Sequence, residues 1–359
     1  MKRQKQKVLV GMSGGVDSSV AAALLIKKGY DVTGGFIKNW SDAKDLWTGE
    51  CEWRGERRDA LRVCAQLGIS LLTFDFEKEY RARVLDRMFE EYEAGFTPNP
   101  DVLCNEEIKF GLFFEQAMQR GFDVVATGHY AQIKSGRLLK GKDPAKDQSY
   151  FLYRLSHDIL QKSLFPIGHL KKTTVRKLAE KYQLSTAKKP DSQGICFVGK
   201  LDFHAFLRKK IKERPGEIVN EQGAIIGHHD GLDAYTIGQR QGLGVSRDRK
   251  PWYVAAKHRQ KNQLMVVPNR DHPLLFSQQA MIGDVNWTRG VSVKDGSRVE
   301  VAIRYRQKPE SAHIFELKAH RYKLVFKKPV WGLAPGQSAV IYTGSECLGG
   351  GFILDEQVG

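Results

Sequence analysis

The chain has 359 residues, with 57 Lys and Arg residues against 41 Asp and Glu residues, a formal net charge of +16 at pH 7. This length predicts two or three domains, and the positive excess favours a polyanionic partner such as nucleic acid. No apolar run approaches the roughly 20 residues that cross a bilayer, which excludes a membrane-spanning protein.

The cysteines are too few and too scattered for a secreted disulfide framework or a C-x-x-C zinc site. They stand at Cys51, Cys64, Cys104, Cys196 and Cys347. Because a strand-like run follows the basic residues 1–7 directly, we also expect no targeting peptide. These features predict a cytoplasmic protein with reduced thiols.

Residues 11–19 form a glycine- and serine-rich segment, GMSGGVDSS, between an apolar run at 8–10 and a helical run at 20–26. In such a strand–loop–helix arrangement, backbone N–H groups and the helix N-terminus hold phosphates. The segment is neither a Walker loop, since no Gly-Lys-Ser/Thr follows, nor the G-x-G-x-x-G dinucleotide fingerprint. It is similar to the pyrophosphate loop of enzymes that cleave ATP to AMP and pyrophosphate, with Asp17 placed to help hold Mg²⁺. The alternative is an ordinary glycine-rich turn that enters a helix.

Residues 1–212 alternate strand-like and helical runs, which is typical of a doubly wound parallel α/β sheet with crossover helices. We expect strands at 8–10, 32–37, 71–74 and 123–128, and helices at 57–67, 80–92 and 110–118. The apolar spacing of the first of these helices predicts one buried face, formed by Ala60, Leu61, Cys64 and Leu67.

The segment 97–105, TPNPDVLCN, contains a candidate nucleophile. Its two prolines keep the residues before Asp101 out of a helix, so Asp101 is a natural N-cap for a helix over 102–113. Cys104 then lies in the first turn, where the helix dipole favours a thiolate. The Asp101 carboxylate is placed to shuttle a proton, although its charge opposes thiolate formation. The alternative is a buried structural cysteine.

The second candidate is Cys196, within the polar and turn-like segment 188–199. The lysine pair at 188–189 favours a thiolate there. The remaining cysteines, Cys51, Cys64 and Cys347, are interpreted as structural or incidental.

After residue 212 glycines become frequent and short alternating runs replace helical periodicity. We expect a small β-rich domain over 213–275 and a C-terminal β-barrel over 276–359. In the barrel, the alternation of mostly apolar with mostly polar residues at 299–306 places Arg304 on the polar face of a strand, where its side chain could bind a phosphate. Tyr305 is expected to stack on a base or to pack inward.

Five segments occur in a fixed order, and together they closely resemble the bacterial tRNA-specific 2-thiouridylases, or tRNA-uridine 2-sulfurtransferases. The segments are residues 11–19, 97–110, 127–131, 146–152 and 191–199. The resemblance runs the length of the chain. It implies that ATP, with Mg²⁺, adenylates the C2 oxygen of the wobble uridine of tRNA. Sulfur then replaces that oxygen, and the products are 2-thiouridine, AMP and pyrophosphate.

The resemblance also implies roles for individual residues. Cys196 receives sulfur as a persulfide from a donor, a cysteine desulfurase relay or an equivalent sulfurtransferase. Cys104 is the nucleophile and resolves the persulfide into a Cys104–Cys196 disulfide, and Asp101 is the proton-transfer partner. The implied ATP contacts are Gly11, Met12, Ser13, Gly14, Gly15, Val16, Asp17, Ser18, Ile37 and Gly128, with Asp17 as the metal ligand. The implied target-uridine contacts are Asn99, Pro100 and Asp101. The implied tRNA contacts are His129, Lys146, Asp147, Gln148, Arg304, Tyr305 and Gln337.

Two features depart from the family pattern. Ile37 stands where methionine is commoner, and the segment 41–57 does not align, so Cys51 has no assigned role. Two other functions compete. Another pyrophosphate-loop enzyme, of the amidotransferase or lysidine-synthetase type, would not need the cysteine pair. A non-catalytic RNA-binding relative would not need the intact loop, either cysteine or Asp101.

Overall fold

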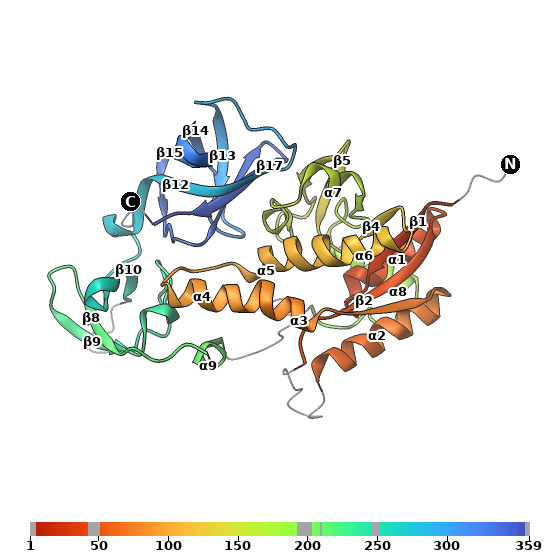
Figure 1. The fold of residues 1–359 in the computed structure, drawn as a ribbon, viewed down its shortest axis with the longest axis horizontal. Helices are drawn as coiled ribbons and strands as arrows, with labels where there is room; N and C mark the ends of the chain where they lie inside the picture. The colour runs from red at the N-terminus through yellow and green to blue at the C-terminus, as the bar shows by residue number, and fades with distance from the viewer. Residues whose placement is uncertain (1–4, 42–50, 192–202, 209, 246–250, 356–359) are drawn as a thin grey trace.

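The computed structural model describes residues 5–41, 51–191, 203–208, 210–245 and 251–355. A five-stranded parallel sheet, a small four-stranded sheet and a β-barrel make up the molecule (Figure 1). Among the described residues, no helix is both long and apolar enough to span a membrane.

The parallel sheet has the strand order β3-β2-β1-β4-β7, and every neighbouring pair in it is parallel. Its strands are β1 (Lys7–Gly11), β2 (Asp31–Lys38), β3 (Leu71–Asp75), β4 (Val124–Ala126) and β7 (Ser163–Leu164). The order reverses between β1 and β4, and ligands of open α/β sheets bind at the carboxyl ends of strands at such a switch point. The doubly wound sheet predicted from the sequence is confirmed.

Helices cover both faces of this sheet because alternate strand residues point to opposite sides. On one face, Val8 and Val10 pack against α1 (Val16–Lys27), α2 (Glu52–Leu67) and α8 (Lys172–Lys181). On the other face, Leu9 packs against two long helical runs. The first run joins α3 (Glu77–Tyr80), the π-helical segment η1 (Arg81–Asp86) and α4 (Arg87–Glu93). The second joins α5 (Pro100–Leu103), the π-helical segment η2 (Cys104–Leu112) and α6 (Phe113–Gln119).

Three predictions about these helices are wrong. The helices expected at 102–113 and 110–118 form one run from Pro100 to Gln119. Its N-cap is Asn99 rather than Asp101, because Pro100 takes the first helical position and the Asn99 side chain accepts the Val102 N–H at 3.4 Å. In α2, which begins five residues earlier than expected, Leu61 is 48% exposed while Ala60 and Cys64 are buried.

The barrel is closed by six antiparallel strands. They are β12 (Phe276–Trp287), β15 (Tyr322–Trp331), β14 (Glu310–Glu316), β13 (Arg298–Ala302), β16 (Ser338–Thr343) and β17 (Glu346–Ile353), with β17 pairing back to β12. The hairpin of β5 (Ala131–Lys134) and β6 (Arg137–Lys140) extends this sheet through a β6–β17 pairing. A hairpin from the first half of the sequence therefore pairs directly with the barrel, which was not predicted.

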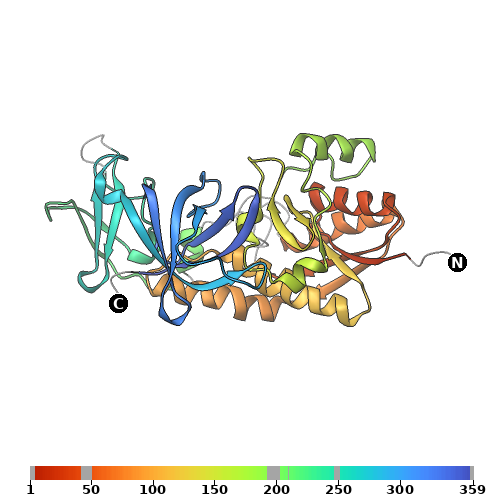
Figure 2. The ribbon, with the colours of Figure 1, turned by 90° about the horizontal axis from the view of Figure 1, so that it is seen from above.

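The middle domain is a sheet of order β10-β11-β8-β9. Its strands are β8 (Gly216–Val219), β9 (Ile225–His229), β10 (Tyr253–His258) and β11 (Gln263–Val267), and Val254, Leu264 and Val266 fill its core. The remaining helices are α7 (His157–Gln161) and α9 (Phe203–Arg208), and the 3-10 turns are η3 (Ser149–Phe151), η4 (Leu232–Ala234), η5 (Arg259–Lys261), η6 (Pro273–Leu275) and η7 (Lys318–His320). Figure 2 shows that the helical runs lie along one side of the molecule, beneath both the parallel sheet and the barrel.

Candidate active site

The glycine- and serine-rich loop lies between β1 and α1, at the switch point of the parallel sheet. Gly15 is the N-cap of α1, and Gly14 has a φ of +71°. A Cβ on Gly14 would lie 2.3 Å from the Glu56 carbonyl oxygen, so only glycine fits the close approach of α2. Ser18 Oγ accepts the Ser13 N–H at 3.2 Å, which closes the loop over the first turn of α1. The result is a compact nest at a helix N-terminus, an arrangement that suits phosphate groups.

A cluster of charged residues adjoins this loop, with Lys172 at its centre. Lys172 Nζ lies 2.8 Å from each Asp17 carboxylate oxygen and 2.8 Å from Oδ1 of Asp191. Asp191 also pairs with Lys146 at 2.7 Å and with Arg176 at 2.6 Å. Although burial opposes it, hydrogen bonds from Lys146 and Lys172 lower the pKa of Asp191 to about 2. The Asp191 carboxylate is therefore ionised, and both carboxylates are paired with cations.

Two further contacts connect the loop to its surroundings. Tyr130, which follows β4, donates its hydroxyl to Asp17 Oδ1 at 2.7 Å. Burial and the charge of Asp17 raise the pKa of Tyr130, so this hydroxyl stays protonated and remains a donor. Lys189 Nζ donates to the Gly14 carbonyl at 3.1 Å and pairs with Asp59 at 2.7 Å. The lysine predicted to favour the Cys196 thiolate is therefore engaged at the loop.

The predicted Mg²⁺ ligand, Asp17, does not fit a metal ion in this arrangement. Both its oxygens accept hydrogen bonds from Lys172, and an ammonium group stands where a cation would bind. In the parts of the chain that the structure describes, no three His, Cys, Asp or Glu residues gather as the ligands of a metal ion. Lys172 therefore supplies the positive charge next to the Asp17 carboxylate.

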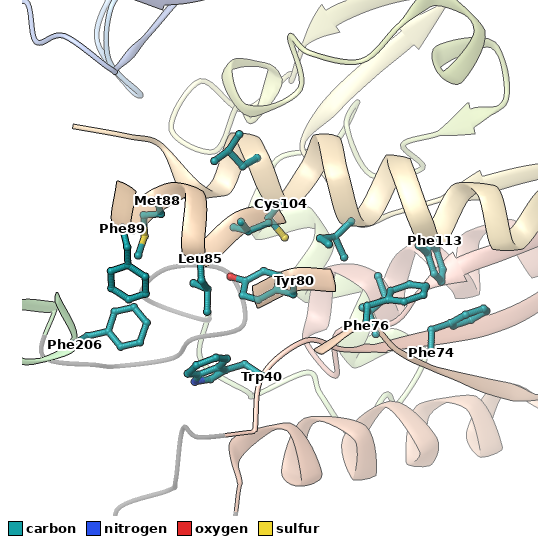
Figure 3. Close-up of a cluster of buried hydrophobic side chains, with 14 of the residues drawn as sticks. Trp40, Phe74, Phe76, Tyr80, Leu85, Met88, Phe89, Cys104, Phe113 and Phe206 are labelled. Carbon is teal, nitrogen blue, oxygen red and sulfur yellow. The ribbon is translucent and has the colours of Figure 1, made fainter. Parts of the chain in front are cut away.

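Cys104 lies in η2 and is fully buried (Figure 3). Its neighbours in the buried cluster include Tyr80, Leu85 and Ile108. The prediction that Cys104 lies in the first turn is wrong, because the helix begins at Pro100 and places Cys104 in the second turn, facing the core. Asp101 lies in the first turn and is partly exposed. Cys196 lies outside the described residues, so its predicted pairing with Cys104 is not described. Cys64 and Cys347 are buried, and burial raises the pKa of the Cys64 thiol to about 11.

The residues predicted to contact tRNA between β4 and η3 lie in two segments, His129 before β5 and residues 146–148 after β6. His129 is buried, with Nδ1 2.7 Å from Thr127 Oγ1, and burial lowers its pKa well below the usual value, so the ring is neutral at pH 7. Asp147 accepts the Gly141 N–H at 2.8 Å, and Gln148 Oε1 accepts the Tyr130 N–H at 2.9 Å. These contacts order the two segments and join them through Tyr130 and Gln148, and the role of their residues toward tRNA remains a prediction.

The prediction that Arg304 lies on the polar face of a strand is wrong. Strand β13 ends at Ala302, because the chain turns there, and Arg304 and Tyr305 follow it. Arg304 Nη2 donates to the carbonyls of Gly332 and Ile237, and the Tyr305 ring packs 4.4 Å from the Phe151 ring. Ile37, a predicted ATP contact, is buried in β2. Contacts of these residues with tRNA or ATP remain predictions.

Comparison with known proteins divides the chain into the same three parts as the structure: the α/β domain, the middle domain and the barrel. Family models match residues 6–200 (tRNA methyl transferase HUP domain), 204–268 (tRNA methyl transferase PRC-barrel domain) and 277–353 (aminomethyltransferase beta-barrel domain). A protein of Pseudomonas aeruginosa named tRNA-specific 2-thiouridylase MnmA is 46% identical, over 98% of this chain and 95% of its own length. Relatives with the same name in Nitrosomonas eutropha and Methylobacillus flagellatus are 48% and 47% identical, over 98% and 97% of this chain and 99% of their own lengths.

This chain belongs to the tRNA-specific 2-thiouridylase family. The resemblance seen in the sequence motifs is thereby confirmed, as is the order of α/β domain, β-rich middle domain and barrel.

Two features of the site were missed in the sequence. Lys172 lies 155 positions from Asp17, and no local pattern connects them. Tyr130 lies two residues beyond Gly128, in a segment already assigned to the family. Its place after the carboxyl end of a parallel strand could have identified it as a residue of the ligand site.

Gly128 provides a test of the loop geometry. A Cβ there would lie 2.7 Å from the Ser18 backbone nitrogen and 2.8 Å from the Asp17 carbonyl carbon, which are backbone atoms of α1 and cannot swing away. Gly128→Ala is therefore expected to shift the N-terminus of α1, to cost about 1–3 kcal/mol of stability and to weaken ATP binding at least about tenfold.

Calorimetric ATP titration and thermal unfolding measure both effects of Gly128→Ala. The matched control is Gly55→Ala in α2, where an added Cβ meets nothing within 4 Å. This control is expected to bind ATP normally. Unchanged ATP affinity in Gly128→Ala would show that the nucleotide site does not require the close approach of residue 128 to the start of α1.

Proposed function

We propose that this protein catalyses ATP-dependent 2-thiolation of the wobble uridine of tRNA. The observation that carries the proposal is the 46–48% identity, over nearly the whole chain, to proteins named tRNA-specific 2-thiouridylases. The phosphate-binding geometry of residues 12–18 supports ATP as the co-substrate. The net charge of +16 suits a nucleic-acid substrate.

The proposed chemistry has two steps. The C2 oxygen of the uridine attacks the α-phosphorus of ATP, and pyrophosphate leaves, with Lys172 and the N-terminus of α1 placed to stabilise its charge. Sulfur then adds at C2, the C2–O bond breaks, and AMP departs. The uridine has to leave the anticodon stack to reach the site, as in other enzymes that act on a base.

The cysteines and Asp101 are proposed to deliver the sulfur. Cys196 carries it as a persulfide, supplied by a sulfurtransferase relay. Cys104 attacks the inner sulfur, so the terminal sulfur passes to C2 and a Cys104–Cys196 disulfide forms, which an external thiol reduces. Asp101 exchanges a proton in this step. Because Cys104 is fully buried in the described arrangement, the proposal requires the apolar side chains around it to part during the cycle.

Mg²⁺ is proposed to arrive with the phosphates of ATP, since this ion is commonly held by one or two carboxylates together with substrate phosphates. Asp17 would become available to it only after Lys172 moves away. Asn99, Pro100 and Asp101 are proposed as target-uridine contacts. A tRNA substrate and cysteines suited to a reducing compartment favour the cytoplasm as the place of the reaction.

The test is incubation of the purified protein with wobble-uridine tRNA, ATP, Mg²⁺ and a persulfide or sulfide source, followed by nucleoside analysis. We expect 2-thiouridine, with one AMP and one pyrophosphate for each uridine converted. AMP and pyrophosphate without 2-thiouridine would indicate another pyrophosphate-loop activity. Binding of tRNA without any ATP cleavage would indicate a non-catalytic relative.

A further inference from the structure

The segment 95–98 joins α4 to the helix that carries Asp101 and Cys104, and the barrel contacts it along its backbone. The contacting element is the loop 334–337 between β15 and β16, which we call the barrel loop. The Thr97 N–H donates to the Pro335 carbonyl at 2.9 Å. Gln337 Nε2 donates to the Thr97 carbonyl at 2.8 Å and lies 3.4 Å from the Pro98 carbonyl. The barrel therefore holds the polar backbone groups directly before Asn99.

Gly336 makes this contact possible. Its φ is +88°, and an added Cβ would lie 2.8 Å from the Thr97 nitrogen and 2.8 Å from Phe96 Cβ. The barrel loop is itself fixed to β17, because the Gly336 N–H donates to the Ile353 carbonyl at 2.9 Å and the Ile353 N–H donates to the Gln337 carbonyl at 2.8 Å. The barrel loop is thus fixed to β17 and leaves no room for a side chain between Gly336 and the segment.

The middle domain holds the same segment from its own elements. Thr236 Oγ1 lies 3.3 Å from Thr97 Oγ1, and Lys257 Nζ donates to the Gly95 carbonyl at 3.2 Å. The Arg259 guanidinium lies 4.6 Å from the centre of the Phe96 ring. Consecutive residues from Gly95 to Pro98 are therefore fixed by two domains that are remote in sequence.

We propose that the barrel loop positions the target-uridine segment 99–101, and that Gln337 acts as a positioning residue through its side-chain nitrogen. This inference rests on the proposed function. Its basis is that the Gln337 side-chain nitrogen is directed at two backbone carbonyls of the chain itself. The segment it holds leads directly into Asn99, whose side chain caps the helix that carries Asp101. A displacement of residues 97–98 would therefore move Asp101.

The test compares Gln337→Glu and Gly336→Ala with the wild type. Glutamate keeps the length of glutamine but removes the donor and directs negative charge at the two carbonyls. Gly344→Ala is the matched control, because Gly344 is a barrel glycine with a φ of +58° and nothing within 4 Å of an added Cβ. The measurements are kcat, KM and equilibrium Kd for tRNA, ATP affinity, and hydrogen–deuterium exchange of the amides at 97–104.

Both test variants are expected to lower kcat about 10- to 100-fold, since small misplacements of reacting groups have effects of this size. We expect tRNA and ATP affinities within about twofold of wild type, and faster exchange at 97–104. Gly344→Ala is expected to match the wild type in kcat and in exchange at 97–104. Should Gly336→Ala fail to fold, Gln337→Glu alone decides the question.

A raised Kd for tRNA in Gln337→Glu with unchanged exchange would overturn the proposal, because Gln337 would then contact tRNA without holding residues 97–104. Unchanged kcat in Gln337→Glu would overturn it as well. If the wild type formed no 2-thiouridine, the proposed function would fail. The exchange comparison would still report whether the barrel loop holds residues 97–104.

Discussion

Cys104→Ser is expected to lower the rate of 2-thiouridine formation by about 1,000-fold or more, because a hydroxyl at its ordinary pKa is a far weaker nucleophile than a thiol. The rate is measured under single-turnover conditions with a persulfide donor, by nucleoside analysis of the tRNA. Cys104 is fully buried, so the serine hydroxyl also has a cost to stability of about 1–3 kcal/mol. Thermal unfolding and ATP titration separate this effect from the loss of chemistry.

The matched control for Cys104→Ser is Cys64→Ser. Cys64 is equally buried, on the opposite face of the parallel sheet, and burial raises its thiol pKa to about 11, so it is unreactive at neutral pH. The control is expected to have a similar stability loss with near-normal thiolation. A thiolation rate in Cys104→Ser that matches this control would show that Cys104 is structural, and the sulfur-transfer mechanism would then need another nucleophile.

The parallel sheet was predictable because its strands are short continuous apolar runs, such as 8–10 and 123–128, buried on both faces. The phosphate loop was predictable because the two glycines and the serines stand together in the chain. Such features are local, so the pattern of neighbouring residues is enough to find them. The β-barrel was predictable for the same reason, since apolar and polar residues alternate along its strands with a period of two.

The start of the Cys104 helix was mispredicted although a signal was present. Asn99 and Asp101 are both good N-cap residues. Pro100, which lies between them, determines which of the two is the cap, because proline favours the first helical position and so places the N-cap at Asn99. With that start, Cys104 moves to the second turn and into the core. The two π-helical segments shift the buried face further, and no periodicity in the sequence marks them.

The contacts that assemble the site join residues far apart in the sequence, which explains why they could not be predicted. Gln337 lies 240 positions from Thr97, and Arg304 lies 67 positions from Ile237. Each of these side chains, taken alone, has the polar character expected of a nucleic-acid contact. Only the fold shows that their donors are directed at backbone carbonyls of the chain itself.

Lys172→Met is expected to weaken ATP binding about 10- to 100-fold, which corresponds to the loss of a charge-assisted contact with a phosphate. The ammonium bridges Asp17 and Asp191 beside the loop. Its removal leaves two carboxylates near the triphosphate with one cation fewer. Calorimetric titration with ATP, at several Mg²⁺ concentrations, measures the change in affinity.

Lys171→Met is the matched control, because Lys171 is the exposed neighbour of Lys172 and its replacement removes the same formal charge. It is expected to bind ATP nearly as the wild type does. The Mg²⁺ series distinguishes two roles for Lys172. If Lys172 contacts phosphate, Lys172→Met weakens ATP binding at every Mg²⁺ concentration. If Lys172 only occupies the place of the metal, its removal frees Asp17, so less Mg²⁺ is needed for tight ATP binding. The second result would return Asp17 to the role of metal ligand predicted from the sequence.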